Sequence, residues 1–208
     1  MSEEIKKTVK KYYDYISVGN RTKQTAYFVE QHDKPIHLEL YIKENTLGKT
    51  LLLTRSKKSA DMLGNLLKDK EINATVVHGN HKPEYVEEVT AAFNKDEAAF
   101  LITTSKIYEA QELSGIKTII YYDLPFEAES YFKTLREVDE VGKSVSFVSI
   151  DDEKMLETIE MMMKYDMPKE EIESFTHTAL PKIDKNRRKK PRHKKNRKKE
   201  TEREDSPE

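Results

Sequence analysis

The chain has 208 residues, of which 36% are hydrophobic and 36% are charged, and its net charge of -1 is close to zero; this balance favours one hydrophobic core with a polar periphery over two cores. Cysteine is absent, which excludes disulfides, thiolate zinc sites and cysteine nucleophiles. No stretch approaches the length of a membrane span and the N-terminus lacks the apolar segment of a signal peptide, so we expect a cytoplasmic protein with no membrane partner.

The first part of the chain predicts a helix over 3–13, a strand over 25–29 and a short amphipathic helix over 32–44. Strands and helices then alternate. Apolar runs predict strands over 50–54, 73–77, 98–103, 117–122 and 144–149. The stretches between them predict helices over 57–69, 83–94, 105–112 and 127–140. This alternation predicts a three-layer α/β fold with a mostly parallel sheet.

A further helix is predicted over 151–165, with Asp151 or Asp152 as its N-cap. Pro168 is predicted to begin a last short helix. From Lys182 onward no apolar periodicity remains, and we predict disorder.

Charge is distributed unevenly along the chain. Residues 182–199 carry 12 Lys/Arg against one acid, a local charge of +11, whereas residues 1–181 carry -8 and residues 200–208 carry -4. A flexible run of cations binds phosphates by releasing condensed counterions, without reading bases. No aromatic residue lies in the basic run, so it offers no stacking on unpaired bases. The run predicts a nucleic-acid partner, with a solubilising tail or a nuclear-import signal as the alternatives. The candidate contacts are Arg187, Arg188, Lys189, Lys190, Arg192, Lys194, Lys195 and Arg197.

Two short patterns do not predict the sites that they first suggest. Gly48-Lys49-Thr50 looks like the end of a phosphate-binding loop, but Lys43 stands where that loop needs its first glycine, and a strand follows instead of a helix. His78 and His81 have no acid in register with them, so a metal site is not predicted there.

The predicted strands end in characteristic residues, which are Leu52-Leu53-Thr54-Arg55-Ser56-Lys57, His78-Gly79-Asn80, Thr103-Thr104 and Tyr122-Asp123-Leu124-Pro125. In this order and spacing they resemble the second RecA-like lobe of DEAD-box RNA helicases, closest to the RhlE-like bacterial subgroup. The resemblance covers about residues 8–199. It implies a RecA-like lobe (the P-loop NTPase type of α/β fold) and the following divisions: a remnant of the first lobe and the interdomain linker over 1–31, the helicase C-terminal domain over 32–150, a helical extension over 151–181, and a disordered basic tail over 182–208.

The resemblance fails at the positions that carry catalysis in the family. There, three arginines of one helix reach the γ-phosphate of ATP held by the first lobe, whereas this chain has Thr134, Glu137 and Glu140. In the preceding motif, Glu109 replaces an arginine. Glu112 replaces the final aspartate, and its carboxylate is expected to lie next to a nucleotide. The departures predict no catalytic residue, no metal and no cofactor, with ATP bound only if a partner supplies the first lobe.

Some positions of the RNA side remain as in the family. Thr104 matches a residue that touches the RNA backbone, and Arg55 leaves its strand on the same rim. Their alternative interpretation is a strand-end hydroxyl and a surface cation. Together with the basic run they predict an RNA or ribonucleoprotein partner.

These observations lead to one main hypothesis and three alternatives. The main hypothesis is a degenerate helicase lobe that binds RNA or ribonucleoprotein without an ATPase activity of its own. The chain is alternatively a module that docks on the first lobe of an intact helicase and regulates it, because linker-like residues are retained. It is otherwise the second half of a split helicase, against which Glu137 and Glu140 argue, or a decaying remnant of a gene.

Overall fold

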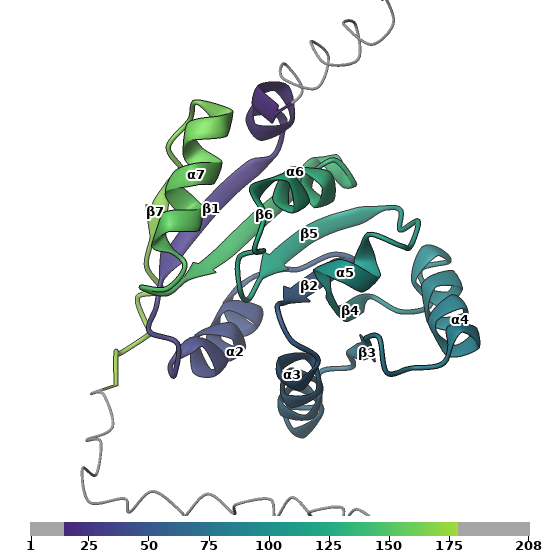
Figure 1. Cartoon of the computed structure of the whole chain (residues 1–208). Coiled ribbons are helices and arrows are strands. Elements are labelled where there is room, and N and C mark those ends of the chain that lie inside the picture. The colour runs from purple at the N-terminus through teal and green to yellow at the C-terminus, as the bar shows by residue number, and fades with distance from the viewer. Residues whose placement is uncertain (1–14, 179–208) are drawn as a thin grey trace, which may run out of the picture. The chain divides into compact units, whose positions relative to one another are not determined.

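The computed structural model describes residues 15–178, without the side chains of 139–141. Within this part, seven strands form one parallel sheet in the order β3-β4-β2-β5-β6-β1-β7 (Figure 1). The strands are β1 (Lys23–Phe28), β2 (Thr50–Thr54), β3 (Thr75–Val77), β4 (Phe100–Thr104), β5 (Ile116–Tyr121), β6 (Val138–Val148) and β7 (Lys169–Glu170). The predicted parallel sheet is confirmed.

Helices cover both faces of this sheet. They are α2 (Lys34–Glu44), α3 (Lys57–Asp69), α4 (Pro83–Asn94), α5 (Ser105–Tyr108), α6 (Ala128–Leu135) and α7 (Glu153–Met163). A helical segment over 15–21 precedes β1. Figure 1 shows α2 and α3 on one side of the sheet and α6 and α7 on the other.

Each face of the sheet has its own apolar cluster, because successive residues of a strand point to opposite faces. Leu51 and Leu53 of β2 pack in one cluster and Leu52 in the other. The first cluster includes side chains of α4, α5, α6 and α7, and the second includes side chains of α2 and α3. The three-layer prediction is therefore confirmed.

The best predicted elements are β2, α3 and α4, whose bounds agree with the sequence analysis. Their ends carry local signals. The hydroxyl of Ser56 accepts a hydrogen bond from the backbone N–H of Ser59 and caps α3. Pro83 occupies the first turn of α4, where its missing N–H removes no helical bond.

Three predicted helices are wrong in whole or in part. The helix predicted over 127–140 ends at Leu135 as α6, because Val138 already belongs to β6, opposite Ile116 of β5. The helix predicted over 105–112 ends at Tyr108 as α5. The helix predicted from Pro168 is absent from the described residues up to 178; there the chain forms β7, which extends the sheet beyond β1.

The predicted divisions 1–31 and 151–181 both contribute to this sheet or its core. β1 pairs with β6 along its whole length, and α7 packs through Leu156, Ile159 and Met163 in the first cluster. The division boundaries themselves stay predictions. The helix predicted over 3–13 and the disorder predicted from 182 lie outside the described residues.

His37 of α2 is buried among aromatic rings of the second cluster. Its ring centroid lies 5.3 Å from that of Tyr27, 4.8 Å from that of Phe147 and 4.9 Å from that of Phe175. Burial, with a smaller contribution from the nearby His177, lowers the pKa of His37 to about 4. The unfolded chain binds the same proton near pH 6.5. Protonation therefore favours the unfolded chain as the pH falls from about 6.5 towards 4.

We expect His37 alone to lower the free energy of unfolding by about 2 kcal/mol between pH 7 and pH 5. The His37→Phe chain should show a pH dependence smaller by that amount, measured by urea denaturation at both pH values. The Nδ1 atom of His37 has no hydrogen-bond partner among the described residues, so a phenyl ring loses no bond there. The same pH dependence in both chains would contradict the assignment.

Candidate functional site

The carboxyl ends of β2, β4 and β5 meet at one edge of the sheet, where parallel α/β sheets commonly bind ligands. Thr54 and Thr104 end β2 and β4 and are direct neighbours in the register. A depression of about 410 Å³ lies beside them. Its lining residues are Thr54, Arg55, Lys57, Thr104, Ser105, Lys106, Glu109, Pro125, Phe126, Glu127 and Ser130. The two body residues predicted to contact RNA, Arg55 and Thr104, are therefore brought together.

Arg55 is fixed by several bonds. Its Nη2 donates to Asp152 Oδ1 and its Nε donates to the carbonyl oxygen of Leu124, each at 2.5 Å. The Arg55 side chain is 24% exposed. The Arg55 side chain is thus paired and partly buried, and its predicted RNA contact stays a prediction.

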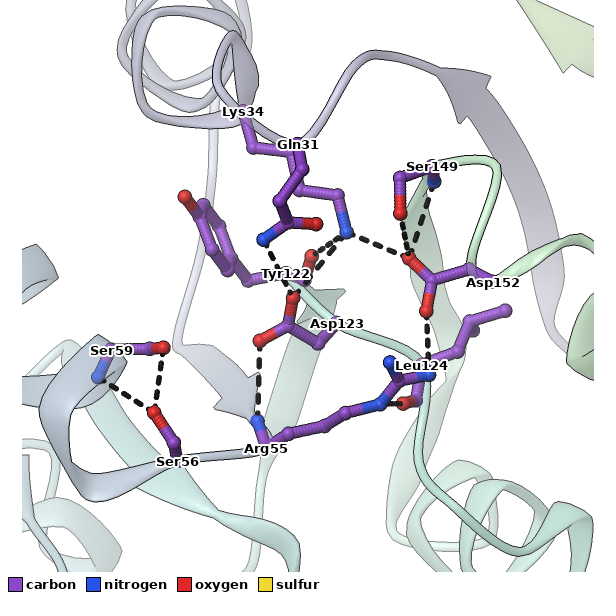
Figure 2. A network of polar contacts seen from close by, with 10 residues as sticks. All are labelled: Gln31, Lys34, Arg55, Ser56, Ser59, Tyr122, Asp123, Leu124, Ser149 and Asp152. Carbon is purple, nitrogen blue, oxygen red and sulfur yellow. Dashed lines mark hydrogen bonds and ion pairs between the residues drawn. The ribbon is translucent and has the colours of Figure 1, made fainter. Parts of the chain in front are cut away.

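The bonds of Arg55 belong to a larger network centred on a fully buried lysine (Figure 2). Lys34 Nζ donates to the carbonyl oxygen of Tyr122 at 2.8 Å and to Asp152 Oδ2 at 2.8 Å, and it lies 3.4 Å from Asp123 Oδ1. Asp123 also accepts from the backbone N–H of Arg55. A buried ammonium needs such partners, because an unpaired one would be very unfavourable.

Asp152 joins the two cations of the network. Burial alone would raise the pKa of Asp152, but the charge and hydrogen bond of Lys34, with two bonds from Ser149, outweigh burial and hold it below the usual value. Asp152 stands at the N-cap position of α7, as one of the two predicted candidates, but makes no capping bond to the helix. Its carboxylate is committed to the network instead.

The network extends to the end of the described chain through the neighbouring Asp33. Asp33 is buried and accepts hydrogen bonds from the backbone N–H and the hydroxyl of Thr178. Asp33 immediately precedes α2 and Lys34 begins it. These two adjacent residues therefore bond to two different parts of the chain: Lys34 to the residues that follow β5, and Asp33 to Thr178.

The cations that line the depression differ in their hydrogen-bond partners and in their exposure. Lys57 Nζ donates to Asn80 Oδ1 at 2.6 Å, and Lys106 is exposed. Glu109 accepts from Ser130 and lies 3.4 Å from Lys133 Nζ. A cation therefore already balances the acid that stands in place of a family arginine.

The positions that align with the family arginines differ in their surroundings. Thr134 is buried, and its hydroxyl donates to the carbonyl oxygen of Ser130 within α6. Glu137 is exposed beyond the end of α6. Burial and, after it, the charge of Glu137 raise the pKa of Tyr108. The side chain of Glu140 lies outside the described part.

Glu112 lies in the loop between α5 and β5 and is exposed. The loop is held by Asn94 of α4, which donates to the carbonyl oxygen of Glu112 and accepts from the backbone N–H of Ser114. The predicted RNA contacts between Arg187 and Arg197 lie outside the described residues.

Over residues 15–178, no three or more His, Cys, Asp or Glu side chains gather as a metal ion would require. His78 instead contacts Asp61, 2.8 Å away, and stacks on His81. None of the helices described is both long and apolar enough to span a membrane.

Sequence reasoning missed three residues that shape this edge. Lys34 looked like an ordinary exposed lysine, and only its position before Pro35 at the start of a helix sets it apart. Asp123 was noted only within its motif. Phe126 follows Pro125 in the turn after an apolar strand, and a large apolar residue in such a turn is the signal that could have identified it.

Comparisons with known proteins agree with this fold. The model of the helicase conserved C-terminal domain family matches residues 33–136, half of the chain. The ATP-dependent rRNA helicase RRP3 of Kluyveromyces lactis is 27% identical over 146 residues, which cover 68% of this chain and 30% of the relative. The DEAD-box ATP-dependent RNA helicase RhpA of Helicobacter pylori is 26% identical over 164 residues, which cover 78% of this chain and 32% of the relative. The chain thus spans about a third of the length of these relatives.

Solved structures are similar in fold. Dbp5 of S. cerevisiae, bound to RNA and ADP BeF3, gives a TM-score of 0.66 at 20% identity, with 72% of this chain and 41% of that chain covered. The E. coli DEAD-box protein SrmB, bound to regulator of ribonuclease activity A, gives a TM-score of 0.67 at 13% identity, with 76% of this chain and 98% of that chain covered. The RhlE-like subgroup stays a prediction. The family match, the parallel sheet and the strand-end motifs agree: the chain belongs to the helicase conserved C-terminal domain family, and its fold is that of the C-terminal RecA-like lobe of DEAD-box proteins.

Proposed function

We propose that this lobe binds RNA or ribonucleoprotein, chiefly through residues 185–199, and has no ATPase activity of its own. The observation that carries the proposal is a change of charge. Where the family presents arginines to ATP, this chain has Thr134, which is buried and bonded within α6, and the exposed carboxylate of Glu137.

The missing arginines have a large expected effect. An arginine that stabilises the charge of a transferring phosphoryl group supplies ~10³–10⁵ in rate. A carboxylate within about 4 Å of a phosphate instead adds repulsion, on the order of 4 kcal/mol near a protein surface. Lys133 does not replace the lost arginines, because it pairs with Glu109. We therefore infer that no hydrolysis takes place on this lobe, whichever chain holds the nucleotide.

The basic run supplies the net positive charge that the rest of the chain lacks. Residues 182–199 carry a charge of +11, while residues 1–181 carry -8. An acidic body repels phosphates at long range, so affinity for RNA must come mainly from the basic run. The relative Dbp5 has been solved with RNA bound, which supports RNA as the class of partner. The expected cytoplasmic location goes with this proposal.

Neutralising half of the basic contacts tests the proposal. Substituting Arg187, Arg188, Lys189 and Lys190 by glutamine should weaken binding to a single-stranded oligoribonucleotide by roughly 10-fold or more, measured by fluorescence anisotropy. Substituting four exposed lysines of the body changes net charge equally and should weaken binding by less than about 3-fold. These control positions are Lys58, Lys68, Lys95 and Lys154. Equal losses in both variants would contradict a dominant tail.

The absence of ATPase activity has its own test. ATP is titrated into the full chain with and without generic RNA, and both nucleotide binding and phosphate release are followed. No phosphate release above background is expected. Release that disappears in the Glu112→Ala chain would overturn the proposal, because it would assign turnover to this lobe.

The alternative of a protein-interaction module is favoured by one specific observation: SrmB, which is similar in fold, has been solved bound to regulator of ribonuclease activity A. On this view the chain docks on the first lobe of an intact helicase. Co-purification with such a lobe that survives nuclease treatment would favour docking over tethering through RNA, and loss of the complex on nuclease treatment would favour the main proposal.

A further inference from the structure

Phe126 stands out among the residues of the depression. It follows β5 and Pro125, and it is 75% exposed. It lines the depression together with Lys57 and Lys106. A large ring left open to water costs free energy unless something covers it, so an exposed phenylalanine in a lined depression marks a contact site.

The ring is held from one side. The guanidinium carbon of Arg55 lies 5.0 Å from the centroid of Phe126, within the range of a cation–π contact. Arg55 is itself fixed by Asp152 and by the carbonyl oxygen of Leu124, and Asp152 is fixed by the buried Lys34. Phe126 is therefore positioned on one side by a chain of buried and partly buried bonds, while most of the ring stays exposed.

The surroundings of the ring select the kind of occupant. Lys106 and Lys57, whose ammonium group also donates to Asn80, supply positive charge, and Thr104 and Ser105 supply hydroxyl groups, while the hydroxyl of Ser130 is donated to Glu109. Two acids, Glu109 and Glu127, also line the depression, but Glu109 is paired with Lys133. A flat apolar ring beside cations and hydroxyls suits a ligand with a flat base and a nearby phosphate, and suits an apolar peptide less well.

We propose that Phe126 is a stacking platform for one unpaired base of a single-stranded RNA, whose flanking phosphates lie at Lys57 and Lys106. The proposal deepens the proposed function and rests on RNA being the partner. It adds a stacking contact of a kind that the basic run lacks, since residues 185–199 contain no Phe, Tyr or Trp side chain. It also differs from the backbone contact expected of Thr104, because stacking distinguishes unpaired from paired bases.

Fluorescence of 2-aminopurine tests the platform in the full chain. The probe is a single-stranded oligoribonucleotide with this base at its centre, and stacking on a ring quenches its emission. Phe126→Ala should remove the quenching and weaken binding by about 5- to 150-fold, the range of one base–aromatic stack. Phe126→Trp should keep both the quenching and the affinity of the native chain. A probe with the same phosphates and no base at its centre should bind the native chain as weakly as the intact probe binds Phe126→Ala.

Tyr165→Ala is the matched control. Tyr165 is also an exposed aromatic residue, but it follows α7 near the amino-terminal edge of the sheet, where Met163 contacts Gly19. The Tyr165→Ala substitution should leave the quenching and the affinity unchanged. Equal effects of the Phe126 and Tyr165 substitutions would overturn the platform.

The same titrations separate the two proposals. If the tail substitutions weaken binding while Phe126→Ala changes neither affinity nor quenching, the platform is wrong and the tail proposal stands. If Phe126→Ala acts while the tail substitutions do not, the platform stands and the tail proposal is wrong. If the native chain binds no RNA, both are wrong, and binding of a protein to the Phe126 face takes their place.

Discussion

Replacing Asp152 by alanine is expected to lower the free energy of unfolding by about 3–5 kcal/mol, measured by urea denaturation at pH 7. The change leaves Lys34 buried with only Asp123 and the carbonyl oxygen of Tyr122, and it removes the ion pair of Arg55. Breaking one partner of a buried pair is costly because the other charge stays out of water.

Asp151→Ala is the control for this prediction. Asp151 is the exposed neighbour of Asp152, so its loss should change stability by less than about 0.5 kcal/mol. The pKa of Asp152 is lowered in the fold, so its stabilisation is present above the usual value of 3.8 and is lost as the pH falls below it. A loss for Asp152→Ala no larger than that for Asp151→Ala would show that the network does not hold the strand ends.

Raising the salt concentration from 50 to 200 mM is expected to weaken RNA binding by the intact chain by roughly 10³-fold. The reasoning is counterion release: about eight phosphates contacted on a single strand give a slope of ~-0.7 per phosphate in log affinity against log salt. The eight predicted tail cations, from Arg187 to Arg197, set that number of contacts. Anisotropy titrations at four or five salt concentrations measure the slope.

Two variants make the slope diagnostic. Substituting all eight tail cations by glutamine should flatten it strongly, because few counterions are then released. Phe126→Ala should lower affinity at every salt concentration but leave the slope unchanged, because stacking of a neutral ring releases no counterions. A native slope as shallow as that of the neutralised chain would reject the tail as the main contact.

Much of the fold was predictable because its elements carry local signals. The apolar run of β2 and the hydroxyl of Ser56 mark the boundary between strand and helix, and Pro83 marks the start of α4. The end of α6 was not predictable in this way. The register between β5 and β6 shifts between Ile116 and Thr118, and this irregular pairing of distant residues overrides the helical pattern that seemed to continue past Leu135.

The site was predictable only in outline. Strand ends of a parallel sheet meet at one edge, so the joint position of Arg55 and Thr104 followed from the order of strands and helices. The bond between Lys34 and Asp152 joins residues 118 positions apart, and no periodicity or spacing relates them. The ion pair between Arg55 and Asp152 could not be predicted for the same reason, because only the fold brings this acid beside Arg55.

The bonds from Thr178 to Asp33 close the folded unit upon itself before the basic segment begins at Lys182. The network contacts described within residues 15–178 involve no residue of the basic segment, so we expect mutations that shorten, lengthen or reorder this segment to preserve them. The share of RNA affinity that the basic segment supplies is therefore free to change without loss of stability, whereas the share that Phe126 supplies depends on the same bonds that stabilise the fold.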